Sequence, residues 1–189
     1  LTPSLPMLRF EGKYVCKRNY GLLVAQIFNV KRHSRVITMI ILVGGEKGGS
    51  GKSCLAQNIA VYLRTEKGAK VLMVDCDPQR TTSDWIQERK ANPRLAEINC
   101  VQLYGKIRNE LLSLRQYYDY VVIDCGGQDN LALRSSMAVA DHILIPLRPK
   151  RRDLKTVPHM EDILSTCKMV NNFTCLIGIS HCFHKGFIR

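Results

Sequence analysis

Short apolar runs recur along the chain, and between them apolar residues return every three or four positions. The runs are continuous rather than alternating with polar residues, which is typical of strands buried on both faces of a sheet. The intervening stretches have the period of a helix with one buried face. Strands are predicted over 36–43, 70–75, 98–103, 120–124, 142–146 and 174–179. Helices are predicted over 53–66, 82–90, 106–116, 131–140 and 154–170, the last with Pro158 in its first turn or breaking it.

This alternation of strands and helices predicts βαβ units, and therefore an α/β fold with a mostly parallel sheet flanked by helices. The chain has 189 residues, which suits one domain with a substantial core. We place that domain at residues 39–189. Residues 1–38 form a leader with one candidate strand at 21–30. It has three alternative origins: read-through upstream of a native start at Met39, a genuine basic arm, or an organellar transit peptide.

The charge pattern suggests a class of partner. The chain carries 28 basic and 16 acidic residues, for a net charge of +12. Half of this excess lies in the leader, and a further basic cluster occupies 148–155. Two explanations fit this excess of positive charge equally. One is a polyanionic partner such as nucleic acid, nucleotide phosphate or an acidic membrane surface, and the other is a basic surface that keeps the protein soluble. No apolar run reaches the ~18 residues of a membrane span, so we expect no transmembrane segment.

The eight cysteines include no C-x-x-C pair, and several lie inside predicted strands. This distribution favours scattered buried thiols in a reducing cytoplasm over a disulfide framework or a zinc site. A composition of 46% hydrophobic and 23% charged residues is that of a globular protein and excludes a disordered one.

A glycine-rich loop, 44–51, separates the first strong strand from the helix that follows. Glycines let successive backbone N–H groups turn toward one point and form an anion-binding nest, to which the helix N-terminus adds its dipole. At this spacing Lys52 reaches the β- and γ-phosphates of a nucleotide, and the Ser53 hydroxyl ligates Mg²⁺. The loop therefore predicts a site for a nucleoside triphosphate.

The loop departs from the common pattern G-x-x-x-x-G-K-[ST], because Glu46 occupies the first glycine position. It matches K-G-G-x-G-K-[ST] from Lys47 to Ser53 instead. This is the deviant Walker A motif, and here the sequence resembles the ParA/MinD group of P-loop ATPases. The resemblance implies ATP and Mg²⁺ as ligands and an ATP-bound homodimer in which Lys47 contacts the partner's nucleotide. A carboxylate at Glu46 would repel nucleotide unless it points outward or pairs with a lysine.

Two predicted strands end in carboxylates. The run Asp75-Cys-Asp77-Pro-Gln resembles switch I of the family, which implies that Asp77 positions or activates the attacking water and that Asp75 supports the metal site indirectly. The run Tyr-Val-Val-Ile-Asp124 resembles a Walker B strand, whose aspartate holds Mg²⁺. Cys125-Gly-Gly127 follows and resembles switch II, where a glycine N–H contacts the γ-phosphate.

The motifs together define the expected site. The expected catalytic residues are Lys47, Lys52, Asp77 and Asp124. The nucleotide is expected to contact Gly48, Gly49, Ser50, Gly51, Lys52, Ser53, Cys54 and Gly127. The expected metal residues are Ser53, Asp124 and Asp75.

The resemblance extends over residues 39–171 and is strongest to the short ParA type of plasmid partition. It implies a bacterial, cytoplasmic and nucleoid-associated ATPase that binds nonspecific DNA as an ATP-dependent homodimer. A centromere-binding partner protein would stimulate its slow hydrolysis, and the cargo would be a plasmid or mobile element. The cluster at 148–155 is either a nonspecific DNA contact or a solvated loop.

Other readings stay open. After Asn172 the sequence departs from the family pattern, which suggests truncation or a frame shift and leaves a non-hydrolysing nucleotide-binding remnant as an alternative. A MinD-like positioning ATPase would need a C-terminal amphipathic basic helix. A redox enzyme like nitrogenase iron protein would need paired cysteines at a dimer interface, for which Cys125 is the one candidate with a supporting context.

Overall fold

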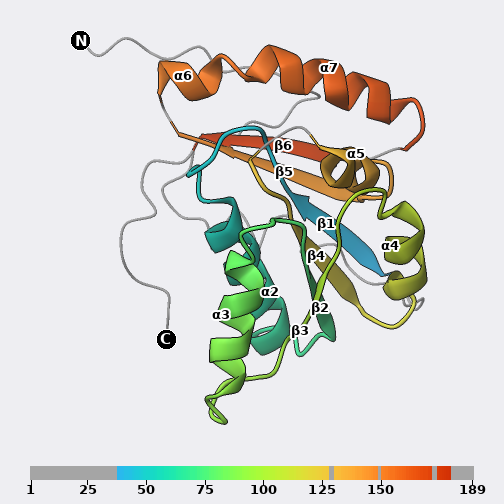
Figure 1. Ribbon diagram of the computed structural model, residues 1–189. Coiled ribbons are helices and arrows are strands. Elements are labelled where there is room, and N and C mark those ends of the chain that lie inside the picture. The colour runs from blue at the N-terminus through green and yellow to red at the C-terminus, as the bar shows by residue number, and fades with distance from the viewer. Residues whose placement is uncertain (1–37, 128–129, 149, 172–173, 180–189) are drawn as a thin grey trace.

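The computed structural model describes residues 38–127, 130–148, 150–171 and 174–179. Within these residues six strands form one sheet in the order β3-β2-β4-β1-β5-β6, and all neighbouring pairs are parallel. The strands are β1 (Met39–Val43), β2 (Val71–Asp75), β3 (Asn99–Gln102), β4 (Tyr120–Asp124), β5 (His142–Leu147) and β6 (Thr174–Ile179). The predicted α/β class is confirmed. β1 lies between β4 and β5 inside the sheet (Figure 1).

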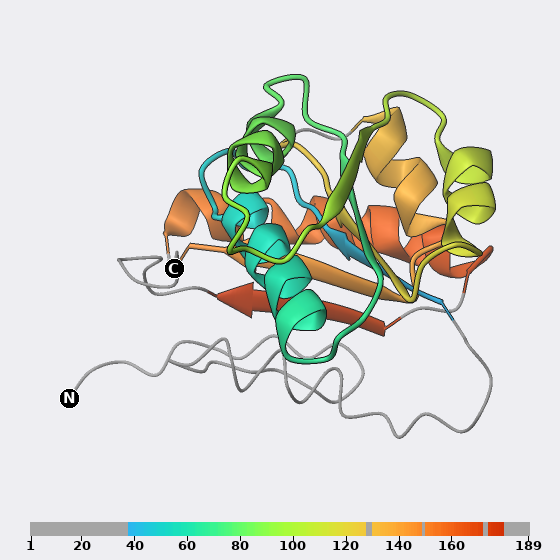
Figure 2. The ribbon, with the colours of Figure 1, turned by 90° about the horizontal axis from the view of Figure 1, so that it is seen from below.

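Helices cover both faces of the sheet (Figures 1 and 2). They are α2 (Lys52–Thr65), α3 (Thr81–Lys90), α4 (Arg108–Arg115), α5 (Leu131–Met137), α6 (Arg151–Leu154) and α7 (Val157–Lys168). Residues of α2 and α3 contribute to one apolar cluster and residues of α4, α5 and α7 to the other, with the sheet between them.

The strands are apolar on both faces because each face packs against helices. In β1, Ile40 and Leu42 join the cluster of α4, α5 and α7, while Ile41 and Val43 join the cluster of α2 and α3. All four side chains are fully buried. Each such side chain stabilises the fold by ~1.5–3 kcal/mol relative to an exposed one. Two-sided burial explains why the runs lack polar alternation.

Two predicted helices differ from the structure. The helix predicted at 154–170 corresponds to α7, which begins only at Val157 with Pro158 in its first turn, whereas Leu154 ends the separate short helix α6. The Thr156 hydroxyl donates to the Asp153 carbonyl at 2.8 Å in the break. The helix predicted at 131–140 ends at Met137. The first strand begins at Met39, and residues 36–37, like the candidate strand at 21–30, lie outside the described residues.

Among the residues with a described conformation, no helix is both long and apolar enough to cross a bilayer.

The strand predicted at 174–179 is confirmed as β6, which pairs with β5 from His142 to Leu147.

Candidate functional site

The carboxyl ends of three strands meet beside the glycine loop. Strand register places Val43 of β1, Asp124 of β4 and Asp75 of β2 at neighbouring positions. The loop of residues 44–51 leaves β1 here and enters α2. Both aspartates are almost completely buried, with exposures of 1% for Asp124 and 0% for Asp75. The structure thus brings together the loop and the carboxylates that the sequence singled out.

Three glycines of the loop, Gly45, Gly49 and Gly51, have a positive φ that favours glycine. Gly49 has φ of +68° and Gly51 has φ of +90°, a left-handed region that side chains disfavour. Gly51 is the N-cap of α2, and no side chain caps the helix there. The first N–H groups of α2 are therefore available to an external acceptor, and an anion is the acceptor that the helix dipole favours.

Lys52 is the buried cation of the site. It is 6% exposed, and its Nζ donates to the Lys47 carbonyl at 2.6 Å. Burial lowers the pKa of Lys52, and the nearby carboxylates Asp124 and Asp77 act in the opposite direction. A desolvated ammonium beside open backbone N–H groups strongly favours an anionic ligand.

Asp124 has one satisfied and one unsatisfied oxygen. Its Oδ2 accepts a hydrogen bond from the Thr82 hydroxyl at 2.6 Å, whereas its buried Oδ1 has no hydrogen-bond partner among the described residues. Burial raises the pKa of Asp124, and the side chains of Thr82 and Ser53 counter this rise. A buried carboxylate oxygen without a donor fits a hard divalent cation, which prefers oxygen ligands.

Asp75 organises the loop that follows β2. Its Oδ2 accepts from the Ser83 N–H at 2.7 Å and from the Ser83 hydroxyl at 2.8 Å, and its Oδ1 accepts from the Asp77 N–H at 3.0 Å. Asp77 itself is partly exposed, and its Oδ1 accepts from the Gln79 N–H. Both oxygens of Asp75 thus hold the segment that carries Asp77.

The segment after β4 lies directly against the glycine loop. A Cβ on Gly127 would come within 2.8 Å of the Gly48 nitrogen and 3.1 Å of the Lys47 carbonyl carbon. A Cβ on Gly126 would come within 3.0 Å of Asp77 Oδ2. Only glycine allows this approach without displacing a neighbour, so the three segments that carry the motifs touch one another.

The other predicted nucleotide contacts lie on the loop and at the start of α2. Ser50 is 3% exposed, and its hydroxyl lies 3.4 Å from the Lys47 carbonyl that also accepts from Lys52. Cys54 is partly buried and accepts from the Asn58 side chain at 3.4 Å; burial raises the pKa of its thiol.

Glu46 pairs with a histidine and not with a lysine. Its Oε1 contacts Nδ1 of His159 on α7, which is more than a hundred residues distant in sequence. The carboxylate that was expected to disturb a phosphate site is thereby held by a separate helix, and no lysine takes part in the ion pairs found for Glu46 in the described part of the chain.

A model of the CobQ/CobB/MinD/ParA nucleotide binding domain matches residues 41–175. The chain belongs to this family. The matched region contains the glycine loop, both carboxylate motifs and most of the sheet. The predicted membership of the ParA/MinD group is therefore confirmed, and the fold is that of a nucleotide-binding domain.

Relatives of the ParA type match part of the chain. Protein ParA of Rhizobium radiobacter is 32% identical over 121 residues, covering 60% of this chain and 50% of that protein. The maintenance of carboxysome distribution protein A of Gloeobacter kilaueensis is 31% identical over 128 residues, covering 61% and 51%. The chain spans about half the length of these curated relatives.

Solved structures share the fold. A plasmid partition protein from Borrelia burgdorferi has a TM-score of 0.65 at 20% identity, covering 81% of this chain and 83% of that one. Cobyrinic acid a,c-diamide synthase from Mycobacterium smegmatis, with bound ADP and magnesium, has a TM-score of 0.61 at 19% identity, covering 75% and 72%. At these identities the likeness establishes the fold.

Two site residues were not predicted from the sequence. Thr82 and Ser83 open α3, are 0% and 5% exposed, and bind the buried Asp124 and Asp75. The Gln57 side chain in turn donates to the Thr82 hydroxyl at 3.1 Å. The available signal was two small hydroxyl residues at a helix start just after the motif at 75–79, a position that usually indicates helix capping.

The basic cluster at 148–155 divides into two parts. Arg148 is bound to Asp153, which is fully buried. Lys150, Arg151, Arg152 and Lys155 are exposed on or beside α6. These four side chains remain available to solvent and to a polyanion.

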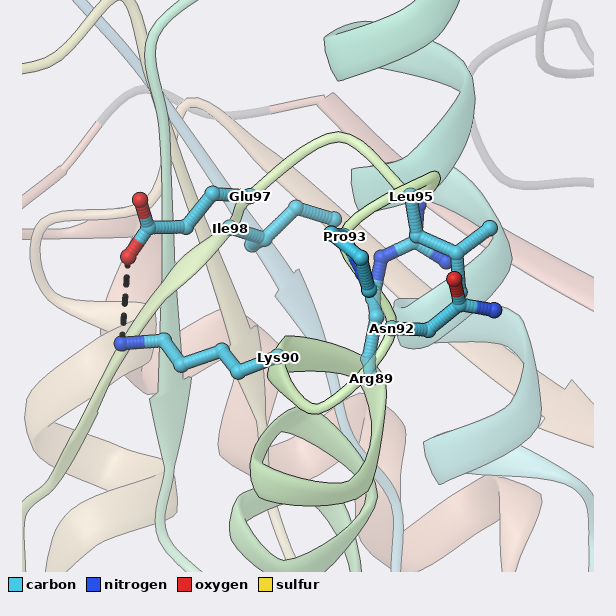
Figure 3. A pocket seen from close by; sticks show the side chains of 7 residues that line it. All are labelled: Arg89, Lys90, Asn92, Pro93, Leu95, Glu97 and Ile98. Atoms are coloured by element: carbon cyan, nitrogen blue, oxygen red, sulfur yellow. Dashed lines mark ion pairs between the residues drawn. The ribbon is translucent and has the colours of Figure 1, made fainter.

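A cavity of about 340 Å³ lies at the C-terminal end of α3, opposite the end that contacts the buried aspartates. Figure 3 shows the side chains that line it. The cavity is formed by the connection from α3 to β3, and an ion pair of 3.3 Å between Lys90 and Glu97 crosses one side. The Arg89 side chain also donates to the Ala96 carbonyl. The charged side chains that line this cavity are thus already paired within the chain.

Proposed function

We propose that this protein binds and hydrolyses ATP as a partition or positioning ATPase of the ParA type. The observation that carries the proposal is that a buried Lys52 and a buried Asp124, whose Oδ1 lacks a donor among the described residues, lie at the N-terminus of α2, which no side chain caps. Such a set offers a cation and backbone donors to phosphates and a carboxylate oxygen to a metal ion.

The residues present fit Mg²⁺. Asp124 and the Ser53 hydroxyl are its expected ligands, and Asp75 supports the site by holding the loop that carries Asp77. When bound with nucleotide, Mg²⁺ would neutralise phosphate charge. Two oxygen ligands from the protein, with waters and phosphate oxygens as the rest, are a usual number for this ion.

Each remaining residue has a defined task in this proposal. The N–H groups of 48–53 bind the phosphates, and Lys52 moves from the Lys47 carbonyl to the β- and γ-phosphates. Asp77 orients the water that attacks the γ-phosphorus, and the Gly127 N–H holds a γ-oxygen. ATP and water give ADP and inorganic phosphate. Because Asp77 lies on a partly exposed loop, hydrolysis is expected to be slow until a partner fixes that loop.

The wider function follows the ParA relatives. We propose that two ATP-bound copies dimerise with Lys47 reaching across to the other nucleotide, and that the dimer binds nonspecific DNA in the bacterial cytoplasm. The exposed basic residues of α6 provide a phosphate-binding surface, with binding that weakens steeply as salt rises. A centromere-binding protein would stimulate hydrolysis and release a plasmid or other mobile element.

Nucleotide titration of matched lysine variants tests the core of the proposal. Lys52→Ala removes the buried cation, whereas Lys67→Ala removes the same charge from an exposed position just beyond α2. Calorimetry with Mg²⁺·ATP should show a loss of affinity on the order of 30-fold or more for the first variant and little change for the second. Equal affinities for the two variants would overturn the assignment of the phosphate site.

Light scattering, phosphate release and DNA binding test the finer claims. An ATP-dependent dimer that binds DNA, and whose slow phosphate release is lost in Asp77→Ala, supports the partition ATPase. Nucleotide binding without turnover would point to the non-hydrolysing remnant.

A further inference from the structure

Arg148 joins three parts of the molecule that lie close to the glycine loop. It follows β5, and it forms a fork with Asp153 of α6: Nε donates to Oδ2 at 2.8 Å and Nη2 donates to Oδ1 at 3.1 Å. Its own backbone N–H also donates to Oδ2, at 3.2 Å. The same Nη2 lies 3.3 Å from the Gly48 carbonyl and donates to it.

Asp153 holds the guanidinium in one orientation. It is fully buried, and the hydrogen bonds from Arg148 keep its pKa below the usual value. The Arg148 side chain is 35% exposed, so it stands at the boundary between a buried acid and the open loop. A planar fork that binds a carboxylate through two nitrogens has little rotational freedom, which directs its remaining N–H toward the loop.

The contact with Gly48 determines where the next N–H points. A trans peptide is planar, so the Gly48 carbonyl and the Gly49 N–H point in opposite directions. A carbonyl held outward by Arg148 leaves the Gly49 N–H on the inner side of the loop. Gly127 lies against the Gly48 nitrogen, which restrains the preceding peptide from another direction.

Gly49 depends on this arrangement. Its φ of +68° allows the turn, and a Cβ there would come within 3.4 Å of Arg148 Nη1. Glycine is also the residue that rotates most freely, so the peptide needs an external restraint to keep one orientation. If the Gly48–Gly49 peptide flipped, the Gly48 carbonyl oxygen would face the phosphates and repel them.

We propose that Arg148 is a positioning residue for the phosphate site: held by Asp153, it fixes the Gly48–Gly49 peptide so that the Gly49 N–H is preset toward the phosphates of a nucleotide. The consequence for binding rests on the proposed function, whereas the orientation of the peptide does not. The two parts are therefore tested separately.

The first test uses ligand-free protein. We would compare the Gly49 amide resonance by NMR in wild type, Arg148→Lys and Arg94→Ala, the last being an exposed arginine between α3 and β3. Lysine keeps a positive charge for Asp153 but lacks the planar fork that fixes the orientation of the N–H directed at Gly48. We expect one narrow resonance in wild type and in Arg94→Ala, and a broadened or doubled one in Arg148→Lys. A narrow, unshifted resonance in Arg148→Lys would refute the proposal.

The second test measures affinities for ADP and ATP. Loss of one restraining hydrogen bond should weaken both nucleotides about 3- to 10-fold in Arg148→Lys, with a saturated hydrolysis rate within about 2-fold of wild type. Asp153→Asn, which loosens the fork while leaving the arginine, should give the same pattern. Thermal melting establishes that each variant is folded at the assay temperature.

The outcomes separate the alternatives. Weaker binding of ATP alone would mean that the guanidinium contacts the terminal phosphate directly. Weaker binding of equal size in Arg94→Ala would mean a general charge effect. Either result overturns a positioning role. If wild type binds neither nucleotide, the proposed function fails, and the amide resonance still decides whether Arg148 orients the peptide.

Discussion

Replacing Gly127 by alanine tests the contact between the segment after β4 and the glycine loop. The new methyl group would lie 2.8 Å from the Gly48 nitrogen and 3.1 Å from the Lys47 carbonyl carbon. Both are backbone atoms, so no side-chain rotation relieves the overlap. Gly44 provides a contrast, because a methyl group there would meet the end of the Leu133 side chain, which can rotate.

The size of the effect follows from overpacking. Forcing a methyl group into a filled contact costs ~1–3 kcal/mol. Replacing glycine by alanine also lowers the entropy of the unfolded chain, which stabilises by ~0.4–1 kcal/mol wherever the native backbone permits alanine. Gly48→Ala is the matched control, because a Cβ there meets no atom within 4 Å and its φ is not left-handed. The difference between the two variants therefore isolates the overlap.

Thermal unfolding of the ligand-free protein measures this difference. For a domain of this length, 1 kcal/mol corresponds to ~2–4 °C, so Gly127→Ala should melt ~2–12 °C below Gly48→Ala. Because the overlap displaces the loop, Gly127→Ala should also weaken nucleotide binding. Equal melting temperatures for the two alanine variants would show that the segment after β4 does not pack on the loop as described.

Three further outcomes are expected. Asp75→Asn puts an amide N–H₂ where Ser83 donates, and should lower the free energy of unfolding by ~2–4 kcal/mol in urea titrations; a loss below 1 kcal/mol would contradict the contact. Asn130→Ala removes the side chain that caps α5 by accepting from the Leu133 N–H at 2.8 Å, and should cost ~1 kcal/mol, restored in Asn130→Asp. Burial lowers the pKa of His142, so the native state favours the neutral ring. The free energy of unfolding should therefore fall as pH drops below ~6.5, the ordinary pKa of histidine, with a slope of at most ~1.4 kcal/mol per pH unit. His142→Leu should remove that slope, and an unchanged pH profile of stability would refute it.

The sheet was predictable because its strands are buried on both faces. The run 120–124 is apolar up to the aspartate that ends it, and β4 covers those same residues. The division between α6 and α7 was not predictable, because apolar residues continue at helical spacing through Leu154, Val157 and Met160. The break is marked by contacts within the folded chain, such as the hydrogen bond from the Thr156 hydroxyl to the Asp153 carbonyl.

The site residues whose role follows from one contiguous motif were predictable. Lys52 follows the loop it serves, and Asp124 ends a strand that register places beside β1. Contacts between distant segments were not predictable: Thr82 reaches Asp124 across 42 positions, and His159 reaches Glu46 across 113. These pairs depend on which helix covers which strand end, and a single sequence does not contain that information.

The attachment of α3 has a consequence for local unfolding. This helix buries only Thr82, Ser83 and Ile86, and its first turn is held by hydrogen bonds to the carboxylates of Asp75 and Asp124. An element with so little apolar contact opens at a free energy well below that of the whole domain. Amide hydrogen exchange should therefore report α3 opening while β1 and β4 stay protected. Helix α3, which covers the buried aspartates, is then the part of the fold that unfolds first. The site can therefore be exposed to solvent while the sheet stays folded.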